Sequence, residues 1–377
     1  MREDEIPRAG SVLTDLGHEG VAVWLDGVGR RSLADGSLGR HAADACVTGA
    51  VLSRRELVRE VRDGTAYEEQ LALLRERGSG VAAAVRALHA YDVRWACDVL
   101  RPVFTATGGQ DGWASAELDP RLADDAAASL AAARAVAQAV NRPNLLVKVP
   151  ATAAGLQVLS DCVTEGIGVN AVHLYAVRRY GDVVEAYFDG LERAAAAGRA
   201  PGGASVASLG AARVEDAVEA RLDAVPKAAA APLRGRSAAA LARAAYAVYE
   251  SGLGTGRWRK LRSAKTRPQR LVWAAPPAPG PEATAVRRVE ELVAWSTVHA
   301  LPAGTLAAVA RRGQLRGDTL SGASAEAEAV LSGLLRQGID VGRIAEELAA
   351  ADLQEAVRDH VELLDTLADR WGGRPRA

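Results

Sequence analysis

The sequence predicts an α/β protein whose parallel strands close into a (β/α)8 barrel. Three observations support this fold class. Eight short apolar runs recur along the chain, longer amphipathic, alanine-rich stretches separate them, and the order alternates from end to end. Strands that alternate with helices indicate a parallel sheet, and eight is the number of strands that closes this type of barrel.

Each predicted strand is a short apolar run, as is typical of strands buried on both faces. In chain order the strands span residues 21–27, 45–52, 113–119, 144–150, 168–174, 202–209, 270–275 and 296–302. Helical patterns fill the gaps. The stretch after the third strand, PRLADDAAASLAAARAVAQAV (120–140), opens with proline and acidic residues and carries an arginine later. This arrangement is typical of a helix that begins at the proline.

The chain has 377 residues, more than a typical barrel needs. We place the excess in a helical insertion at 54–106, between strands two and three, and in a helical C-terminal extension at 320–377. Residues 1–14 are expected to form an N-terminal tail. The proline cluster AAPPAPGPEA (274–283) is interpreted as a loop after strand seven. Without an internal repeat or a linker, residues 1–377 are predicted to be one domain.

Composition excludes several classes of protein. The formal net charge is −1, which argues against nucleic acid or an acidic membrane as a partner. Cys46, Cys97 and Cys162 are widely spaced and lack a CxxC pair, which fits a reducing compartment and neither a disulfide framework nor a zinc site. The acidic, polar N-terminus is unlike a signal peptide, and no apolar run approaches the length of a membrane span. We therefore expect a cytoplasmic protein without a bound metal.

A lysine inside an apolar strand is the most informative residue. Lys148 lies within NLLVKVPAT (144–152), and only four of the 46 basic residues are lysines. Burial of an unpaired ammonium group is unfavourable, so this lysine needs a reason. Lysine, unlike arginine, can lose its proton and act as a nucleophile. The alternative is a lysine at a strand end that extends its amine into solvent.

Carboxylates end other predicted strands. Asp26 closes strand one, and Glu117 and Asp119 close strand three. In (β/α)8 barrels the chemistry lies at the carboxyl ends of the strands. A lysine surrounded by carboxylates there suits Schiff-base chemistry on a carbonyl substrate. Each carboxylate has the alternative role of a helix cap or a surface charge, and we assign Asp119 to the cap of the next helix.

These residues resemble those of a known family. The segment NLLVKVPATAAGLQVLSDCVTEGIGVN is similar to the sequence around the Schiff-base lysine of transaldolases, and the similarity extends from VAVWLDG through ACDVLRPVF, AELDPRLADD and ASVASLGAARVEDAVEARLD to GDTL. The longer bacterial transaldolases are the most similar. The resemblance implies a barrel of the class I aldolase type. It also implies transfer of a dihydroxyacetone unit from a ketose phosphate to an aldose phosphate, with no metal or organic cofactor.

The resemblance assigns roles to individual positions. Lys148 corresponds to the Schiff-base lysine, Asp26 to the aspartate that handles the substrate hydroxyl proton, and Glu117 to the glutamate that orders the catalytic water. Asn170 matches an asparagine near the imine. Arg213 matches an arginine that holds the substrate phosphate.

Other positions depart from the family pattern. Ser53 replaces an asparagine in the substrate site and Arg54 a proline. Val172 replaces a threonine that contacts the catalytic water, and Ala212 replaces a serine beside the phosphate arginine. The loop after strand seven, AAPPAPG, lacks the expected hydroxyl and basic groups. Arg54 is interpreted as the first turn of a solvated helix rather than as a new anion contact.

Three hypotheses about function follow. The chain is an ordinary transaldolase of the pentose phosphate pathway, a Schiff-base enzyme redirected to another carbonyl substrate in specialised metabolism, or a non-catalytic relative. The altered positions favour the second. The expected partner is a small sugar or sugar phosphate, and the protein is expected to be a monomer or a homodimer. His173 and His299 also fall in strands, where histidines are more often structural.

Overall fold

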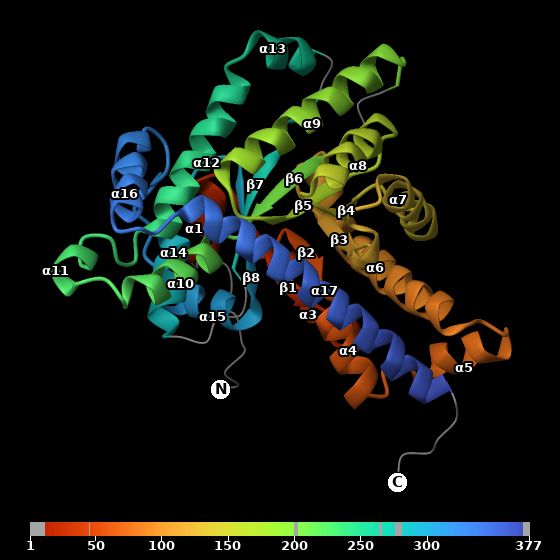
Figure 1. Ribbon diagram of the computed structural model, residues 1–377. Helices are drawn as coiled ribbons and strands as arrows, with labels where there is room; N and C mark the ends of the chain where they lie inside the picture. Colours follow the sequence, from red (N-terminus) through yellow and green to blue (C-terminus); the bar gives the residue numbers. More distant parts are fainter. Residues whose placement is uncertain (1–11, 45, 200–202, 264–265, 276–280, 372–377) are drawn as a thin grey trace.

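A closed barrel of eight parallel strands forms the centre of the molecule (Figure 1). The computed structural model describes residues 12–44, 46–199, 203–263, 266–275 and 281–371. Each strand pairs with the next one in the chain, and β8 pairs with β1. The predicted (β/α)8 barrel is therefore confirmed.

All eight strands lie where the apolar runs predicted them. Their bounds are β1 Val21–Val28, β2 Gly49–Leu52, β3 Trp113–Glu117, β4 Leu145–Pro150, β5 Val169–Leu174, β6 Ser205–Leu209, β7 Arg270–Ala274 and β8 Thr297–Pro302. The largest difference is at β2, which begins four residues later than predicted. Cys46 and Val47 instead donate their backbone N–H groups to the carbonyl of His41. They therefore complete the end of the preceding helix rather than the sheet.

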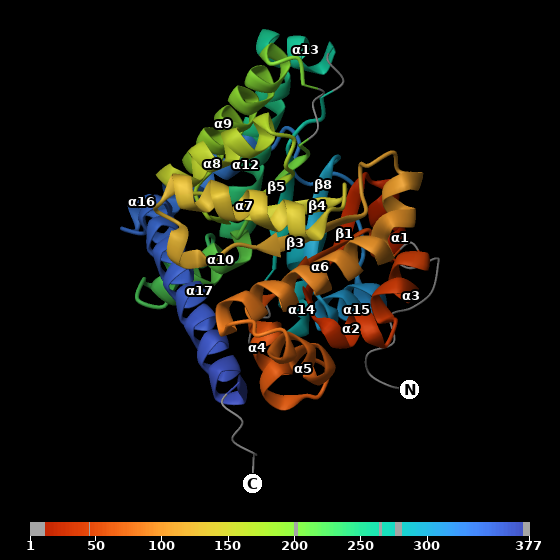
Figure 2. The ribbon, with the colours of Figure 1, turned by 90° about the vertical axis from the view of Figure 1, so that its right-hand side faces the viewer.

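Helices surround the barrel (Figure 2). Those before β4 are α1 Val12–His18, α2 Arg30–Ala34, α3 Ser37–Ala43, α4 Arg54–Asp63, α5 Glu68–Glu76, α6 Val81–Ala106 and α7 Ala126–Val140. Those from β4 to β8 are α8 Ala153–Thr164, α9 Val177–Ala196, α10 Ala211–Leu222, α11 Lys227–Ala230, α12 Ser237–Leu253, α13 Gly256–Ser263 and α14 Glu282–Glu290. After β8 come α15 Ala303–Arg312, α16 Ser324–Arg336 and α17 Val341–Trp371.

The helix predicted from residue 120 is divided in two. Pro120–Leu122 form a 3-10 turn, in which the Asp119 carboxylate accepts a hydrogen bond from the Arg121 N–H, and α7 begins only after Asp125. The Asp125 carboxylate accepts a hydrogen bond of 2.9 Å from the Ala128 N–H, which caps α7. Asp119 is therefore a cap, as expected, but of the short turn and not of the long helix.

Side chains fill the barrel interior, as is typical of this fold. The interior cluster comprises Ala22, Trp24, Val51, Trp113, Leu146, Val206, Val272, Val298 and Ala300. A second, larger cluster joins the outer faces of the strands to the helices. Gly49 makes room for the Trp24 side chain, because a Cβ atom there would lie 2.5 Å from the Trp24 ring.

The surplus residues form helices in two segments, which contact each other through α17. Segment 54–106 contains α4, α5 and α6, and segment 320–377 contains α16 and α17. Helix α17 crosses one end of the barrel and packs against α4, α6, α10 and β5 (Figure 1). A third apolar cluster, which includes Leu57 and Tyr67 of the insertion and Leu363 and Leu367 of α17, joins the two segments.

Several predicted features extend beyond the described residues, among them the C-terminal extension, whose residues 372–377 lie outside. The N-terminal tail predicted at 1–14 overlaps α1, which begins at Val12, and residues 1–11 lie outside the described part. Residues 276–280 of the loop after strand seven also lie outside it. Within the described ranges, no helix combines the length and the apolar character needed to cross a membrane.

Candidate active site

Strand alternation places the predicted site residues inside the barrel mouth. Trp24 and Leu146 belong to the interior cluster, and Asp26 and Lys148 each follow two residues later, so they share that face. Glu117 of β3, Lys148 of β4 and Asn170 of β5 are also direct neighbours in the strand register. Three predicted residues therefore lie side by side at one level of the barrel.

Lys148 points into the barrel. Its Nζ donates hydrogen bonds to the Leu52 carbonyl at 2.8 Å and to Glu117 Oε1 at 3.1 Å, and its side chain is only 13% exposed. The amine borders a pocket of about 130 Å³, which is also lined by Pro150, Val172 and His173. The alternative in which this lysine extends into solvent is therefore wrong.

Glu117 lies between two cations. Its Oε1 accepts from Lys148, and its Oε2 forms an ion pair with Arg54 Nη1 at 3.0 Å. Burial alone would raise the pKa of the Glu117 carboxyl, but the charges of Arg54 and Lys148 outweigh burial and hold the pKa at about 2. Glu117 is therefore ionised at neutral pH and suits the role of a hydrogen-bond acceptor rather than a proton donor.

The prediction that Arg54 lies in a solvated helix turn is wrong. Its side chain is 10% exposed, and Nη2 donates a hydrogen bond of 2.6 Å to the Leu118 carbonyl. Helix α4 begins at Arg54, directly after β2 and its cap Ser53, so its first turn lies at the barrel mouth. The anion that Arg54 binds is the protein's own Glu117.

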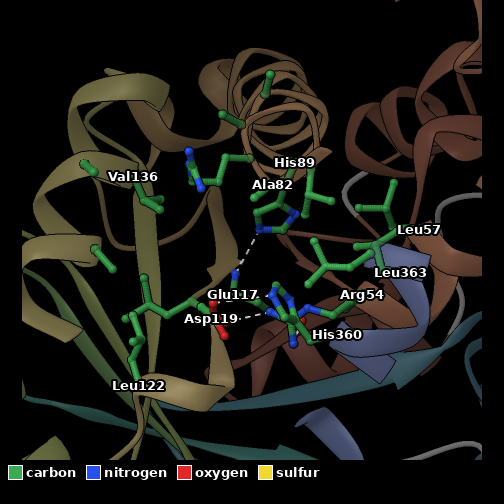
Figure 3. Close-up of a pocket in the computed structure, with 18 of the residues that line it drawn as sticks. Arg54, Leu57, Ala82, His89, Glu117, Asp119, Leu122, Val136, His360 and Leu363 are labelled. Atoms are coloured by element: carbon green, nitrogen blue, oxygen red, sulfur yellow. Dashed lines mark hydrogen bonds and ion pairs between the residues drawn. The ribbon is translucent and has the colours of Figure 1, made fainter. Parts of the chain in front are cut away.

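Two histidines that sequence reasoning missed complete the surroundings of Glu117 (Figure 3). His89 of α6 accepts a hydrogen bond of 3.0 Å from the Glu117 N–H through Nε2, and burial lowers its pKa to about 4. His360 of α17 lies with Nε2 3.4 Å from Asp119 Oδ2, and burial, together with the charge of Arg54, lowers its pKa to about 4. Both residues are on helices, and no motif in the sequence marks them.

Figure 3 shows that these residues also border a second pocket, on the α6 and α7 side of Glu117. Its volume is about 550 Å³, and alanine, valine and leucine side chains make up most of its lining. It shares Arg54, Glu117, Leu118 and Asp119 with the Lys148 pocket. These four residues therefore form the wall between the two spaces.

Asp26 is electrostatically linked to the lysine. Burial raises the pKa of its carboxyl above the usual range, the positive charge of Lys148 opposes the rise, and the charge of Glu117 adds to it. Its Oδ1 accepts a hydrogen bond of 2.9 Å from the Gly27 N–H. Strand β1 continues to Val28, so Asp26 lies two residues before the strand end and does not close it as predicted. Asp26 and Glu117 thus have pKa values shifted in opposite directions.

Asn170 and Ser53 have partners within the protein. Asn170 is almost completely buried, its Nδ2 donates to Ser115 Oγ at 3.3 Å, and its Oδ1 accepts from Ser208 Oγ at 2.8 Å. Ser53 is the N-cap of α4, and its hydroxyl accepts a hydrogen bond of 3.4 Å from the Glu56 N–H. Their assignment to substrate binding stays a prediction.

Arg213, predicted to hold a phosphate, is engaged by α17. Its Nη1 forms an ion pair with Asp352 Oδ1 and lies 4.0 Å from Glu355 Oε2. The Tyr175 hydroxyl donates a hydrogen bond to the other oxygen of Asp352. The sequence gives no sign of these contacts, because α17 and α10 are far apart in the chain.

The two strand histidines differ in position. His299 is buried, and its Nε2 lies 3.1 Å from the Leu292 carbonyl oxygen. This contact indicates a structural role. His173 borders the Lys148 pocket and has a positive φ of 54°. The register of β5 against β6 shifts around it, between Ala171 and Leu174. A positive φ is unfavourable for a residue with a Cβ, and such positions cluster at functional sites.

Cysteine, histidine and acidic side chains are the ones that could bind a metal ion. Cys46, Cys97 and Cys162 are buried, as small apolar side chains are. In the part of the chain that the structure describes, no three His, Cys, Asp or Glu side chains are grouped so that they could hold a metal ion.

Comparison with known proteins identifies relatives across nearly the whole chain. The family model described as transaldolase/fructose-6-phosphate aldolase matches residues 23–367. A protein named transaldolase from Thermobifida fusca is 41% identical over 362 residues, which cover 96% of this chain and 98% of the relative. One from Acidothermus cellulolyticus is 41% identical over 352 residues, covering 93% and 94%. Transaldolase 1 of Streptomyces avermitilis is 40% identical over 358 residues, covering 94% and 95%.

Proposed function

Because the chain belongs to the transaldolase/fructose-6-phosphate aldolase family, we propose that it is a transaldolase-type enzyme that acts on a sugar or a sugar-like carbonyl compound through a Schiff base. The observation that carries the proposal is the position of Lys148. Its amine lies at the barrel mouth, hydrogen-bonded to Glu117, and it borders a pocket large enough for the reacting carbons of a small substrate.

In the proposed reaction, the Lys148 amine adds to the substrate ketone, and the carbinolamine loses water to form an iminium ion. A carbon–carbon bond of the substrate then breaks. Its electron pair moves to the iminium to form an enamine, and the proton of the departing hydroxyl passes to Asp26. The enamine attacks an acceptor aldehyde with return of that proton, and hydrolysis of the new iminium releases the product and the lysine.

The opposite pKa shifts support different roles for the two carboxyls. The raised pKa of Asp26 suits a group that takes up and returns a proton during the reaction. The pKa of about 2 at Glu117 suits a permanent acceptor that orients the water which enters and leaves. Environments that separate two carboxyl pKa values in this way are typical of acid–base sites.

Two versions of this function differ in substrate. The names of the relatives favour an ordinary transaldolase, since they cover the chain at about 40% identity. The ion pair between Arg213 and Asp352, together with Val172 and Ala212, favours an altered substrate. A non-catalytic role has no support from the site, because Lys148 and Glu117 retain a direct contact. A cytoplasmic location and a monomeric or homodimeric state stay predictions.

Borohydride trapping tests the proposal. The protein is incubated with ketoses and ketose phosphates, reduced, and digested for peptide mass mapping. We expect substrate carbon on the peptide that contains Lys148, and we expect Lys148→Arg to abolish the adduct and the activity. Lys260→Arg, an exposed site on α13, is the matched control and should behave as wild type. An adduct on another lysine, or activity that persists in Lys148→Arg, would refute the proposal.

A further inference from the structure

The charges around the Lys148 pocket are already balanced by groups of the protein. Only Lys148 and Arg54 carry a positive charge among the residues that line the pocket. Glu117 contacts both of them. A phosphate group on a substrate would therefore have to compete with Glu117 for either cation, inside a site where unpaired charge is unfavourable.

Another cation near the carboxyl ends of the strands is Arg213, at the start of α10 and directly after β6. His173 connects the two regions, since it lines the Lys148 pocket and is within electrostatic reach of Arg213 and Asp352. Arg213 faces two carboxylates of α17, those of Asp352 and Glu355. Glu355 also pairs with Arg55, so Asp352 is the carboxylate that neutralises Arg213. An anionic ligand would have to displace Asp352 to reach Arg213.

Asp352 is held firmly at this position. Its side chain is 11% exposed, whereas that of Arg213 is 33% exposed. Tyr175 donates to one carboxylate oxygen and Arg213 contacts the other, so both oxygens are engaged. Displacement of Asp352 by a phosphate would leave a buried carboxylate beside a dianion, which is strongly unfavourable.

The sequence directly after β7 supplies no positive charge. Residues 276–280, after β7, read PPAPG and carry no ionisable side chain. Arg178, Arg179 and Arg343 line a separate outer cleft, which shares Pro150 and His173 with the Lys148 pocket. Arg343 pairs with Glu347 at 3.1 Å. Arg179 there pairs with Asp182 at 3.1 Å.

We propose, on the basis of the function inferred above, that Asp352 determines the substrate class of this enzyme. By holding Arg213, it makes the far end of the site fit a neutral, hydroxylated carbon chain and reject a phosphate. Hydroxyl groups can share hydrogen bonds with Tyr175, His173 and the outer edge of Arg213 without separating the ion pair. The substrate is then an unphosphorylated ketose or a related polyhydroxy ketone.

The test compares a matched pair of ketoses that differ only in the phosphate. Formation of the borohydride-reduced adduct on Lys148 is measured against the open-chain concentration of fructose and of fructose 6-phosphate. For the wild-type protein we expect the half-saturating concentration of fructose to be equal to or lower than that of fructose 6-phosphate. Asp352→Asn retains the shape of the side chain and removes its charge. We expect this variant to lower the half-saturating concentration of fructose 6-phosphate by about tenfold or more, as a charge-assisted hydrogen bond to the released Arg213 would.

Asp352→Asn should change the half-saturating concentration of fructose by less than about threefold, because a neutral chain gains no charge-assisted contact. Glu347→Gln is the matched control, since it removes a carboxylate of the same helix that pairs with Arg221 and Arg343 instead. Glu347→Gln should leave the half-saturating concentrations of both ketoses as in wild type. If Asp352→Asn does not fold, Glu355→Gln, at a more exposed position, should move the ratio of the two values in the same direction.

Three outcomes would overturn the inference. The first is a wild-type protein that takes fructose 6-phosphate about tenfold better than fructose. The second is a folded Asp352→Asn protein with an unchanged ratio. The third is a phosphate preference that only Arg178→Gln removes, which would place the anion site in the outer cleft. Absence of an adduct with every ketose would instead overturn the proposed function, and this inference with it.

Discussion

Replacement of Arg54 by methionine tests whether this residue sets the charge state of Glu117. Methionine has a similar length but no charge, so Glu117 would keep only Lys148 as a cationic partner. The pKa of Glu117 should rise from about 2 toward its ordinary value of 4.5. The full difference between these values corresponds to about 3 kcal/mol of stability. Arg54 should contribute the larger share, because it is the stronger of the two opposing charges.

The sign of the pH dependence follows from the direction of the shift. A carboxyl with a lowered folded-state pKa stabilises the protein fully above about pH 4.5, and this contribution is lost as the pH falls toward 2. For wild type, about 2 kcal/mol of the contribution should already be lost at pH 3. The loss of the hydrogen bond to the Leu118 carbonyl, by contrast, does not depend on pH in this range.

Urea unfolding at pH 7 and at pH 3 provides the measurement. We expect Arg54→Met to be less stable than wild type by roughly 2–3 kcal/mol at pH 7, and we expect the difference to narrow clearly at pH 3. Arg55→Gln is the control, because this neighbour is 65% exposed and its surface ion pairs with Glu355 and Asp359 should contribute less than about 1 kcal/mol. An equal difference at both pH values would show that Arg54 does not act through the charge of Glu117.

Four further predictions concern catalysis and packing. Glu117→Gln should slow multiple turnover by about 10²- to 10⁴-fold while borohydride still traps an adduct on Lys148, and an unchanged steady-state rate would contradict the proposed role. Asp26→Asn should block carbon–carbon cleavage, so that single-turnover quench shows accumulation of trapped donor; rapid release of the aldehyde product would be evidence against this role. Turnover of fructose 6-phosphate with erythrose 4-phosphate as acceptor should fall far below the median enzyme rate of about 10 per second in a coupled assay, and a rate at or above that value would restore the ordinary transaldolase. Gly49→Ala should lower the free energy of unfolding by about 1–3 kcal/mol, because the new methyl group would lie 2.5 Å from the Trp24 ring. Urea denaturation provides the measurement, and a change of less than about 0.5 kcal/mol would mean that the ring moves freely.

The part of the site built on strands was predictable from sequence because strands have a period of two. Once the run around Lys148 is placed as a strand, its inward direction follows, and the same argument applies to Asp26 and Glu117. The resemblance to a family then assigned roles to these residues. The pairing of β3 with β4 follows from the order of the strands in a closed barrel, but the register that sets Glu117 beside Lys148 was not predicted.

The part of the site built on helices was not predictable in this way. His89, His360 and Asp352 reach the mouth because α6 and α17 pack over it, and no local pattern encodes which helix covers which strand end. Arg54 was misjudged for a related reason. The first turn of a surface helix is usually solvated, but this one starts directly at a strand end and points toward Glu117.

The position of α17 has a consequence for the biosynthesis of the protein. Residues 341–371 leave the ribosome after all eight strands, and domains fold while the chain is still emerging. The contact of Lys148 with Glu117 uses only β3 and β4, so it can form early in synthesis. Arg213, Tyr175 and Arg55 acquire their carboxylate partners only when α17 docks. The order of synthesis therefore separates the two parts of the site: the strands that carry the nucleophile are made first, and the helix that neutralises the mouth is made after them.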